Sequence, residues 1–136
     1  MRNNLSHPKN YPYWKELISI LQKKGHHIIQ IGTNNEDILT EDVRFNLSFE
    51  KLRDLSHSAD LFISVDNFFP HLANHYIGCK GIVIFSQSDP NIFGYKQNIN
   101  LLKDKKYLRE QQFWLWEQCD YIKESFVSPE IVANYV

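Results

Sequence analysis

The sequence has few cysteines, no long apolar run and almost no net charge, and each absence excludes a class of protein. The two cysteines, Cys79 and Cys119, match neither a disulfide framework nor a four-ligand zinc pattern, which favours a reducing, cytoplasmic compartment. No apolar run approaches the ~20 residues that a membrane-spanning helix requires, and the first residues contain no signal-peptide core. We therefore expect no transmembrane segment.

Charge and size point to one globular domain that does not bind nucleic acid. The 15 Lys and Arg residues nearly balance the 16 Asp and Glu residues, for a formal net charge of −1, so neither nucleic acid nor anionic lipid is an expected partner. The chain has 136 residues, of which 43% are hydrophobic, and a chain of this length buries roughly two-thirds of its unfolded surface. We expect a single domain over residues 1–136, with residues 1–10 as a loose amino-terminal arm.

Several familiar catalytic and binding motifs are also missing. There is no G-x-G-x-x-G, no phosphate-binding G-x-x-x-x-G-K-[ST] and no G-x-S-x-G that would present a serine nucleophile. His71 and His75 are spaced i, i+4 and could share a helix face, but the glutamate of a metalloprotease helix is absent between them. We therefore predict no metal site and no bound cofactor.

The order of apolar patterns predicts an α/β fold. Amphipathic helical patterns alternate with short runs that are apolar on both faces, the pattern of a parallel sheet covered by helices on both sides. We predict a Rossmann-like domain with a parallel sheet of about four to five strands and a helical carboxyl-terminal region over residues 103–136. The expected strands are 27–31, 43–45, 61–65, 81–85 and 99–101. The expected helices begin near Trp14, Ser48, Phe68 and Ser128.

Three segments that follow predicted strands are candidates for a binding site. Ligands of open α/β sheets bind beyond the carboxyl ends of the strands, where helix amino termini also point. The segments 32–36, 66–71 and 86–90 are rich in hydrogen-bonding groups, and the helix start after Asp66 suits a phosphate group. They predict a polar small-molecule site, although ordinary surface loops are polar as well.

Four motifs share their order and spacing with a known family. The longest, Asp66-Asn-Phe-Phe-Pro-His71-Leu-Ala73, follows a leucine-rich helix and a strand that begins at an Ala-Asp pair, and it is similar to D-[ST]-G-x-x-H-x-A. The segment 78–90 is similar to G-x-P-x-[VI]-x-[LI]-[FY]-G-x-[TS]-x-P. Lys9 begins a K-x-x-P that is similar to K-x-W-P, and Gly32-x-x-x-Glu36 matches G-x-x-x-E. Over residues 9 to about 95, the chain resembles the carboxyl-terminal domain of heptosyltransferase-like family 9 glycosyltransferases.

The resemblance implies a role for each matched residue. In that family this domain is half of a GT-B enzyme, and it binds the nucleotide-diphosphate sugar donor for a transfer that needs no metal ion. Asp66 would bind hydroxyl groups of the donor sugar and Glu36 would bind those of the ribose. The residues implied to support or contact the diphosphate are Lys9, Asn67, His71 and Ser88.

Each of these residues also has a purely structural interpretation. Asp66 and Asn67 are both suitable helix caps, and His71 could be a histidine that only packs. Lys9 could be a solvated charge on the arm, Glu36 an exposed loop acid and Ser88 an ordinary turn residue. Phe68 departs from the family pattern, because it replaces a glycine whose backbone would approach phosphate closely.

The predicted function is transfer of a sugar from a nucleotide-diphosphate donor to a hydroxyl acceptor. No catalytic residue is assigned, because the family's acceptor-binding domain and catalytic carboxylate have no match here. Transfer would need a partner chain, a second copy or a local base. The alternatives are a non-catalytic nucleotide- or sugar-binding module that acts with a partner, and a structural remnant. Trp114, Leu115 and Trp116 either fill the core or form a docking surface for the missing half.

Overall fold

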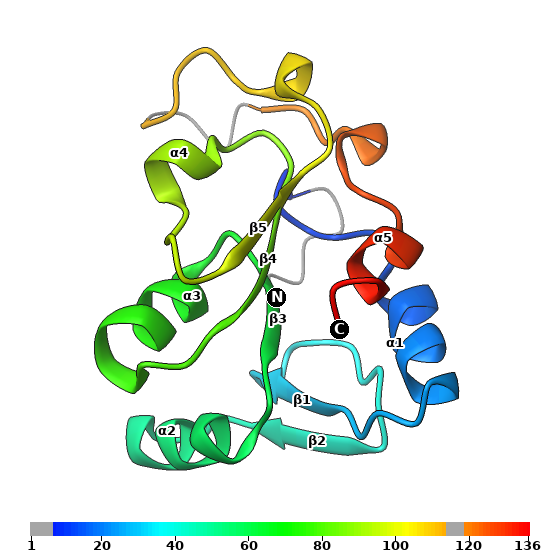
Figure 1. Cartoon of the computed structure of the whole chain (residues 1–136), viewed down its shortest axis with the longest axis vertical. Coiled ribbons are helices and arrows are strands. Elements are labelled where there is room, and N and C mark those ends of the chain that lie inside the picture. The colour runs from blue at the N-terminus through cyan, green and yellow to red at the C-terminus, as the bar shows by residue number, and fades with distance from the viewer. Residues whose placement is uncertain (1–6, 114–118) are drawn as a thin grey trace.

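The computed structural model describes residues 7–113 and 119–136, which form one α/β unit (Figure 1). Its strands are β1 (Ile29–Gly32), β2 (Asp42–Phe45), β3 (Phe62–Val65), β4 (Gly81–Phe85) and β5 (Ile99–Leu102). Its α-helices are α1 (Trp14–Lys23), α2 (Phe49–Ser58), α3 (Phe68–Leu72), α4 (Pro90–Phe93) and α5 (Pro129–Ala133). A π-helical turn η1 (Ala73–Ile77) continues α3, and two 3-10 turns are η2 (Lys105–Tyr107) and η4 (Lys123–Ser125). Among these residues no helix is long and apolar enough to cross a membrane.

All of the described strands pair in parallel, and helices lie on both sides of them, so the architecture is Rossmann-like α/β as predicted. The strands do not form one sheet of four to five strands, however. β1 pairs with β2 in a two-stranded sheet, and β3, β4 and β5 form a second sheet in that order. The two sheets also differ in burial, since every residue of β1 is only half-buried whereas every residue of β4 is buried.

The core lies between the three-stranded sheet and the helices at the two ends of the chain. Ile82 and Ile84 of β4 belong to one buried cluster with Leu17 of α1 and Val132 of α5. Figure 1 shows α1 and α5 side by side on one flank of the molecule, with α2, α3 and α4 on the other. The Tyr11 hydroxyl donates a hydrogen bond to the Val127 carbonyl at 3.0 Å, so the two ends of the chain are joined inside the core.

Helix starts follow the predicted capping chemistry at two positions. The Ser48 hydroxyl accepts a hydrogen bond from the Lys51 amide, and the Asn67 side chain accepts one from the Phe69 amide at 2.9 Å. Asn67, rather than Asp66, is therefore the cap of α3. Gly78 ends the following π-turn in the left-handed region at φ 78°, where glycine has no steric penalty.

Two predictions about the chain ends are wrong for the described residues. Leaving out residues 114–118, the range 103–136 is not mainly helical, because its described part contains the five-residue α5 and otherwise only the 3-10 turns η2 and η4. A hydrogen bond joins the Lys103 ammonium to the Glu124 carbonyl at 2.7 Å. Residues 7–10 are not loose, because the Ser86 hydroxyl donates to the carbonyl of the buried Pro8. Residues 1–6 and the predicted core or docking role of Trp114, Leu115 and Trp116 lie outside the described residues.

Candidate functional site

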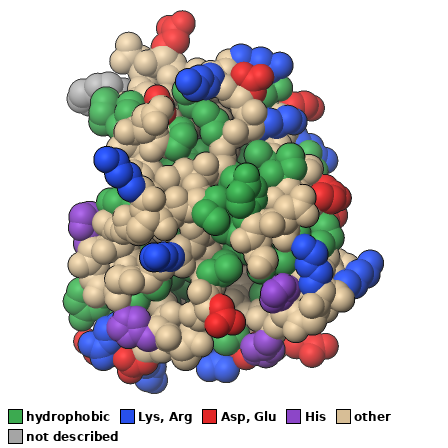
Figure 2. Space-filling model, viewed as in Figure 1, with side chains coloured by type: hydrophobic (Ala, Val, Ile, Leu, Met, Phe, Trp, Pro, Cys, Tyr) green, Lys and Arg blue, Asp and Glu red, His purple; other side chains and the backbone are tan. Residues whose placement is uncertain are grey.

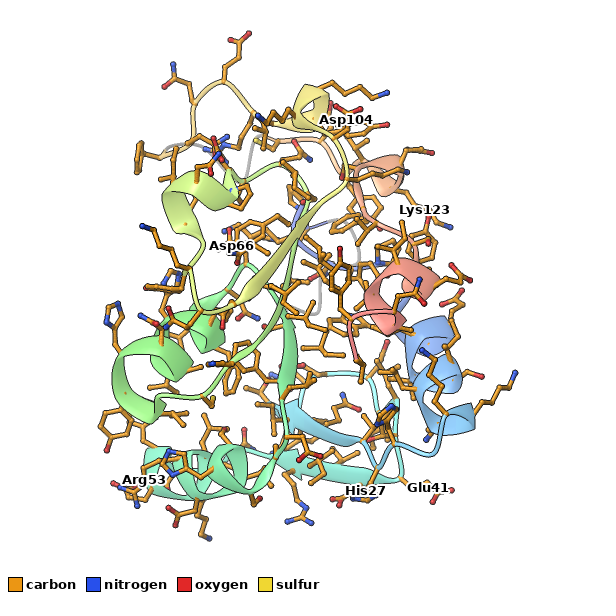
Figure 3. The ribbon with its side chains drawn as sticks, viewed as in Figure 1. His27, Glu41, Arg53, Asp66, Asp104 and Lys123 are labelled. Carbon is orange, nitrogen blue, oxygen red and sulfur yellow. The ribbon has the colours of Figure 1, made fainter. Side chains whose placement is uncertain are left out.

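Three of the predicted site residues meet at one oxygen atom. Oδ2 of Asp66 accepts a hydrogen bond from the Ser88 hydroxyl at 2.5 Å and lies 2.7 Å from the Lys9 ammonium. We call Lys9, Asp66 and Ser88 the Asp66 cluster. Figure 3 shows Asp66 toward the middle of the molecule, whereas Arg53, Glu41 and Asp104 lie near its margins.

The topology explains why these residues meet. Val65 and Ile84 are paired in the parallel register of β3 and β4, so the loops that carry Asp66 and Ser88 leave the sheet at the same edge. That edge is the carboxyl end of the strands, where ligands of this fold class bind. Lys9 reaches the cluster because the Ser86 hydroxyl holds the preceding residue, Pro8, at 3.0 Å.

The Asp66 cluster is buried and internally paired. Asp66 is 5% exposed and Ser88 is 1% exposed, while the Lys9 side chain keeps 22% of its surface in solvent. A carboxylate so deeply buried is expensive unless it is paired and hydrogen-bonded, and Lys9 and Ser88 supply both requirements. The Asp66 carboxylate is therefore stabilised in this structure by groups of the chain itself.

The other predicted site residues make their described contacts elsewhere. Asn67 accepts hydrogen bonds from the Ser64 hydroxyl and the Phe69 amide, as a helix cap. The His71 ring lies 2.7 Å from the Tyr95 hydroxyl. The Glu36 carboxylate accepts a hydrogen bond from the Thr33 amide at 3.1 Å, within the loop that follows β1. Lys9, Asp66 and Ser88 thus contact one another. The contacts described for Asn67, His71 and Glu36 do not connect those residues to the Asp66 cluster.

Phe68 does not seal the cluster. Its side chain is 64% exposed, and its ring lies beside that of Phe49, which is 55% exposed, with 6.3 Å between ring centroids. The helical spacing of Phe49, Leu52, Leu55 and Ala59 predicts that Phe49 lies on the inner face of α2, and its exposure shows that the prediction is wrong for Phe49. The helical period alone therefore assigns Phe49 to the core incorrectly.

The loop after β4 has a structural role, as a buried link to the carboxyl-terminal segment, that the sequence does not predict. Ser86, Gln87 and Ser88 are all at most 5% exposed. Gln87 donates from Nε2 to the Asp120 carbonyl at 2.7 Å, which ties the carboxyl-terminal segment to the same edge of the sheet. The sequence does show three polar residues directly after a fully apolar strand. Their burial, however, is visible only in the three-dimensional structure.

A surface hollow of about 320 Å³ lies at the opposite edge, where β1 and β2 begin. One of its two acidic residues, Asp42, is held by Arg44 at 2.6 Å and by His27 at 3.1 Å. The hydrogen bond from Arg44 is the main cause that lowers the Asp42 pKa. The hollow is at the amino ends of its strands, away from the edge where ligands of this fold class bind, so we assign it no ligand. It is lined by Gln22, His26, His27, Ile28, Glu41 and Asp42.

Charges of both signs are interspersed on the face shown in Figure 2, around hydrophobic side chains that gather near its middle and upper part. Within the described residues, no three His, Cys, Asp or Glu side chains form a group that could hold a metal ion. Comparisons with models of protein families, with curated proteins and with solved structures found no match to this chain. The family 9 resemblance therefore remains a prediction based on the motifs quoted above.

Proposed function

We propose that the chain is the donor-binding unit of a glycosyltransferase similar to family 9, and that it binds a nucleotide-diphosphate sugar at the Asp66 cluster. The observation that supports the proposal best is the meeting of Lys9, Asp66 and Ser88 on one oxygen atom at the ligand-binding edge of the sheet. The three residues come from separate motifs of the family pattern.

The chemistry of the cluster suits such a donor. A carboxylate accepts hydrogen bonds from sugar hydroxyl groups, a lysine ammonium neutralises diphosphate charge, and a serine hydroxyl donates to a phosphate oxygen. In the structure the Lys9 ammonium lies 2.7 Å from Oδ2 of Asp66, so the two charges neutralise each other. A donor would insert between them, so that Lys9 takes the diphosphate and Asp66 takes the sugar. The ion pair is then the closed form of the site.

In the transfer reaction, the bond from the anomeric carbon to the diphosphate breaks and a bond to the acceptor oxygen forms. The acceptor hydroxyl loses its proton to a base, which we do not assign. Lys9 would stabilise the charge on the departing diphosphate. The base and the acceptor site would come from a partner chain, a second copy or another segment.

One observation favours the second candidate, a binding module without catalytic activity. The Asp66 carboxylate is 5% exposed and already has two partners, so the resting site is closed by the chain's own groups. A module that opens only with a partner would have this property. The two functions share the donor site and differ in whether sugar transfer follows.

Calorimetric titration with ADP-, UDP-, GDP- and CMP-sugars tests both candidates. We expect saturable binding of at least one donor and at least tenfold weaker binding by Asp66→Ala, since two hydrogen bonds or more to sugar hydroxyls are lost. Asp60→Ala is the matched control, because Asp60 is an exposed acid just before β3. Far-UV circular dichroism checks that Asp66→Ala is folded. Absence of binding at millimolar donor would overturn the proposal.

A second assay separates the enzyme from the module. Donor hydrolysis and sugar transfer are followed with the chain alone and with candidate partner chains. Turnover that is reduced in Asp66→Ala but not in Asp60→Ala supports the transferase. Binding without turnover in any combination supports the module.

A further inference from the structure

Two histidine rings converge on one tyrosine hydroxyl, away from the contacts of the Asp66 cluster. The Tyr95 hydroxyl oxygen lies 2.7 Å from Nδ1 of His71 and 3.0 Å from Nε2 of His75. Both rings meet the Tyr95 ring edge-on, with centroids 5.5 and 5.2 Å away. Three atoms with lone pairs therefore lie together: two imidazole nitrogens and one phenol oxygen.

Hydrogen bonds can join these three groups only if one facing ring nitrogen is protonated and the other is not. A phenol has a single proton to donate, so at most one histidine can accept it. The other histidine must present its own N–H to the same oxygen. A metal cation would instead use a lone pair of each of the three atoms. On binding, the phenol proton would pass to solvent and any facing imidazole proton would move to the other ring nitrogen.

The backbone holds the three side chains in place. His71 is in α3 and His75 is in the π-turn η1, four residues later, so both project from the same side of one continuous helical segment. Single π-turns within helices frequently mark functional sites. Tyr95 lies between α4 and β5, and its carbonyl accepts hydrogen bonds from the Asn98 amide and the Asn100 side chain, each at 3.0 Å. The site is thus built from two segments that are each fixed.

We propose that His71, His75 and Tyr95 bind a transition-metal ion of the zinc or nickel class. Imidazole nitrogen is a preferred ligand of these ions. Zinc bonds of about 2.0–2.2 Å in a tetrahedral arrangement separate ligand atoms by about 3.3 Å, close to the 2.7 and 3.0 Å between the Tyr95 oxygen and the two ring nitrogens. His75 is exposed, and solvent can complete the coordination. This proposal does not depend on the proposed donor site.

Calorimetric titration of the tag-free, reduced full-length chain with ZnCl2 and with NiCl2 tests the proposal. We expect one saturable site and at least tenfold weaker binding by both His75→Gln and Tyr95→Phe, because loss even of groups that only support a ligand costs about 10- to 100-fold. His26→Gln is the matched control, since His26 is also an exposed histidine, and Cys79→Ser tests for thiol binding. Both controls should bind like the unaltered protein.

The shift in melting temperature on adding zinc is a second test, and it compares each variant with itself, so small effects of the substitution on folding cancel. Zinc should raise the melting temperature of the unaltered chain but not of His75→Gln, because a ligand that binds only the native state stabilises it. The proposal is overturned by the absence of saturable binding, by unchanged affinity in His75→Gln, or by a loss of affinity in either control. Unchanged affinity in Tyr95→Phe overturns the three-ligand site, since two histidines would then be sufficient.

Discussion

The Ser88 hydroxyl donates a 2.5 Å hydrogen bond to Oδ2 of Asp66, which joins the loops that follow two neighbouring parallel strands. The same oxygen pairs with the Lys9 ammonium, so one atom connects three segments that are distant in the sequence. The Asp66 cluster therefore has a structural role whether or not a ligand binds there. Stability measurements can define that role without knowledge of the ligand.

Replacing Asp66 by Asn should lower the free energy of unfolding by about 2 kcal/mol. The change removes the carboxylate charge that pairs with the Lys9 ammonium, and the cost is below the 3–5 kcal/mol of a fully buried pair because the Lys9 side chain is 22% exposed. Urea denaturation measures the effect, with Asp60→Asn as a surface control. Lys9→Met added to Asp66→Asn should cost less than the sum of the two single changes. Strictly additive costs would contradict the pairing.

Replacing Ser88 by Ala should cost about 1–2 kcal/mol of unfolding free energy. Ser88 is 1% exposed, and its loss removes a hydrogen bond from a buried carboxylate. Ser58→Ala is the control, because the Ser58 hydroxyl donates to a backbone carbonyl at an exposed position. Its effect should stay within about 0.5 kcal/mol. Equal effects of the two changes in urea denaturation would show that the Ser88 hydroxyl is not important.

Alkaline pH should destabilise the protein through Tyr11. Burial is the main cause that raises the pKa of this phenol, and the nearby Tyr13 adds to it. Because the folded-state pKa is above the unfolded value of about 10, the unfolded chain loses this proton first as the pH rises. The contribution to stability is complete below about pH 10 and is lost above it.

The variant Tyr11→Phe tests this pH dependence. This substitution should lower the free energy of unfolding by about 1 kcal/mol at neutral pH, since the hydrogen bond to Val127 is lost. Above pH 10 the stability of the variant should fall less steeply than that of the unaltered protein. Urea unfolding from pH 7 to 11 provides the measurement. The exposed Tyr135→Phe should keep the pH profile of the unaltered protein. Parallel profiles for Tyr11→Phe and the unaltered chain would refute the assignment.

Gly81 should tolerate no side chain, because a Cβ there would collide with the backbone oxygen of Phe62 on the neighbouring strand. Gly81→Ala should therefore cost at least the 1–3 kcal/mol typical of overpacking. Gly25→Ala is the comparison: Gly25 has φ +88° with open space around it, so only left-handed strain of about 1–2 kcal/mol applies. If thermal or urea unfolding gave Gly25→Ala the larger cost, the predicted clash at Gly81 would be wrong.

The features that were predictable from sequence were local or followed from topology. Apolar runs located each strand to within two residues of its observed bounds, because burial on both faces leaves a continuous pattern. The meeting of Asp66 and Ser88 followed from the parallel arrangement, since parallel strands place their carboxyl ends at one edge.

The features that were not predictable depend on contacts without a sequence pattern. Lys9 is positioned by the hydrogen bond from Ser86 to the carbonyl of Pro8. Every residue has a backbone carbonyl, so the sequence does not indicate this contact. Tyr95 meets His71 across 24 residues of chain, so the histidine spacing alone did not indicate a third group. The apolar pattern of the sequence also does not show that β1 and β3 belong to separate sheets, nor that β1 is only half-buried.

The pairing of α1 with α5 also bears on how the molecule is made. Leu17 and Leu21, near the start of the chain, belong to the same buried cluster as Phe126 and Val132, near its end. A nascent chain still lacking its last residues would expose those leucines to the ribosome surface and to chaperones. The domain should therefore complete its folding only after residues 126–133 have emerged from the ribosome.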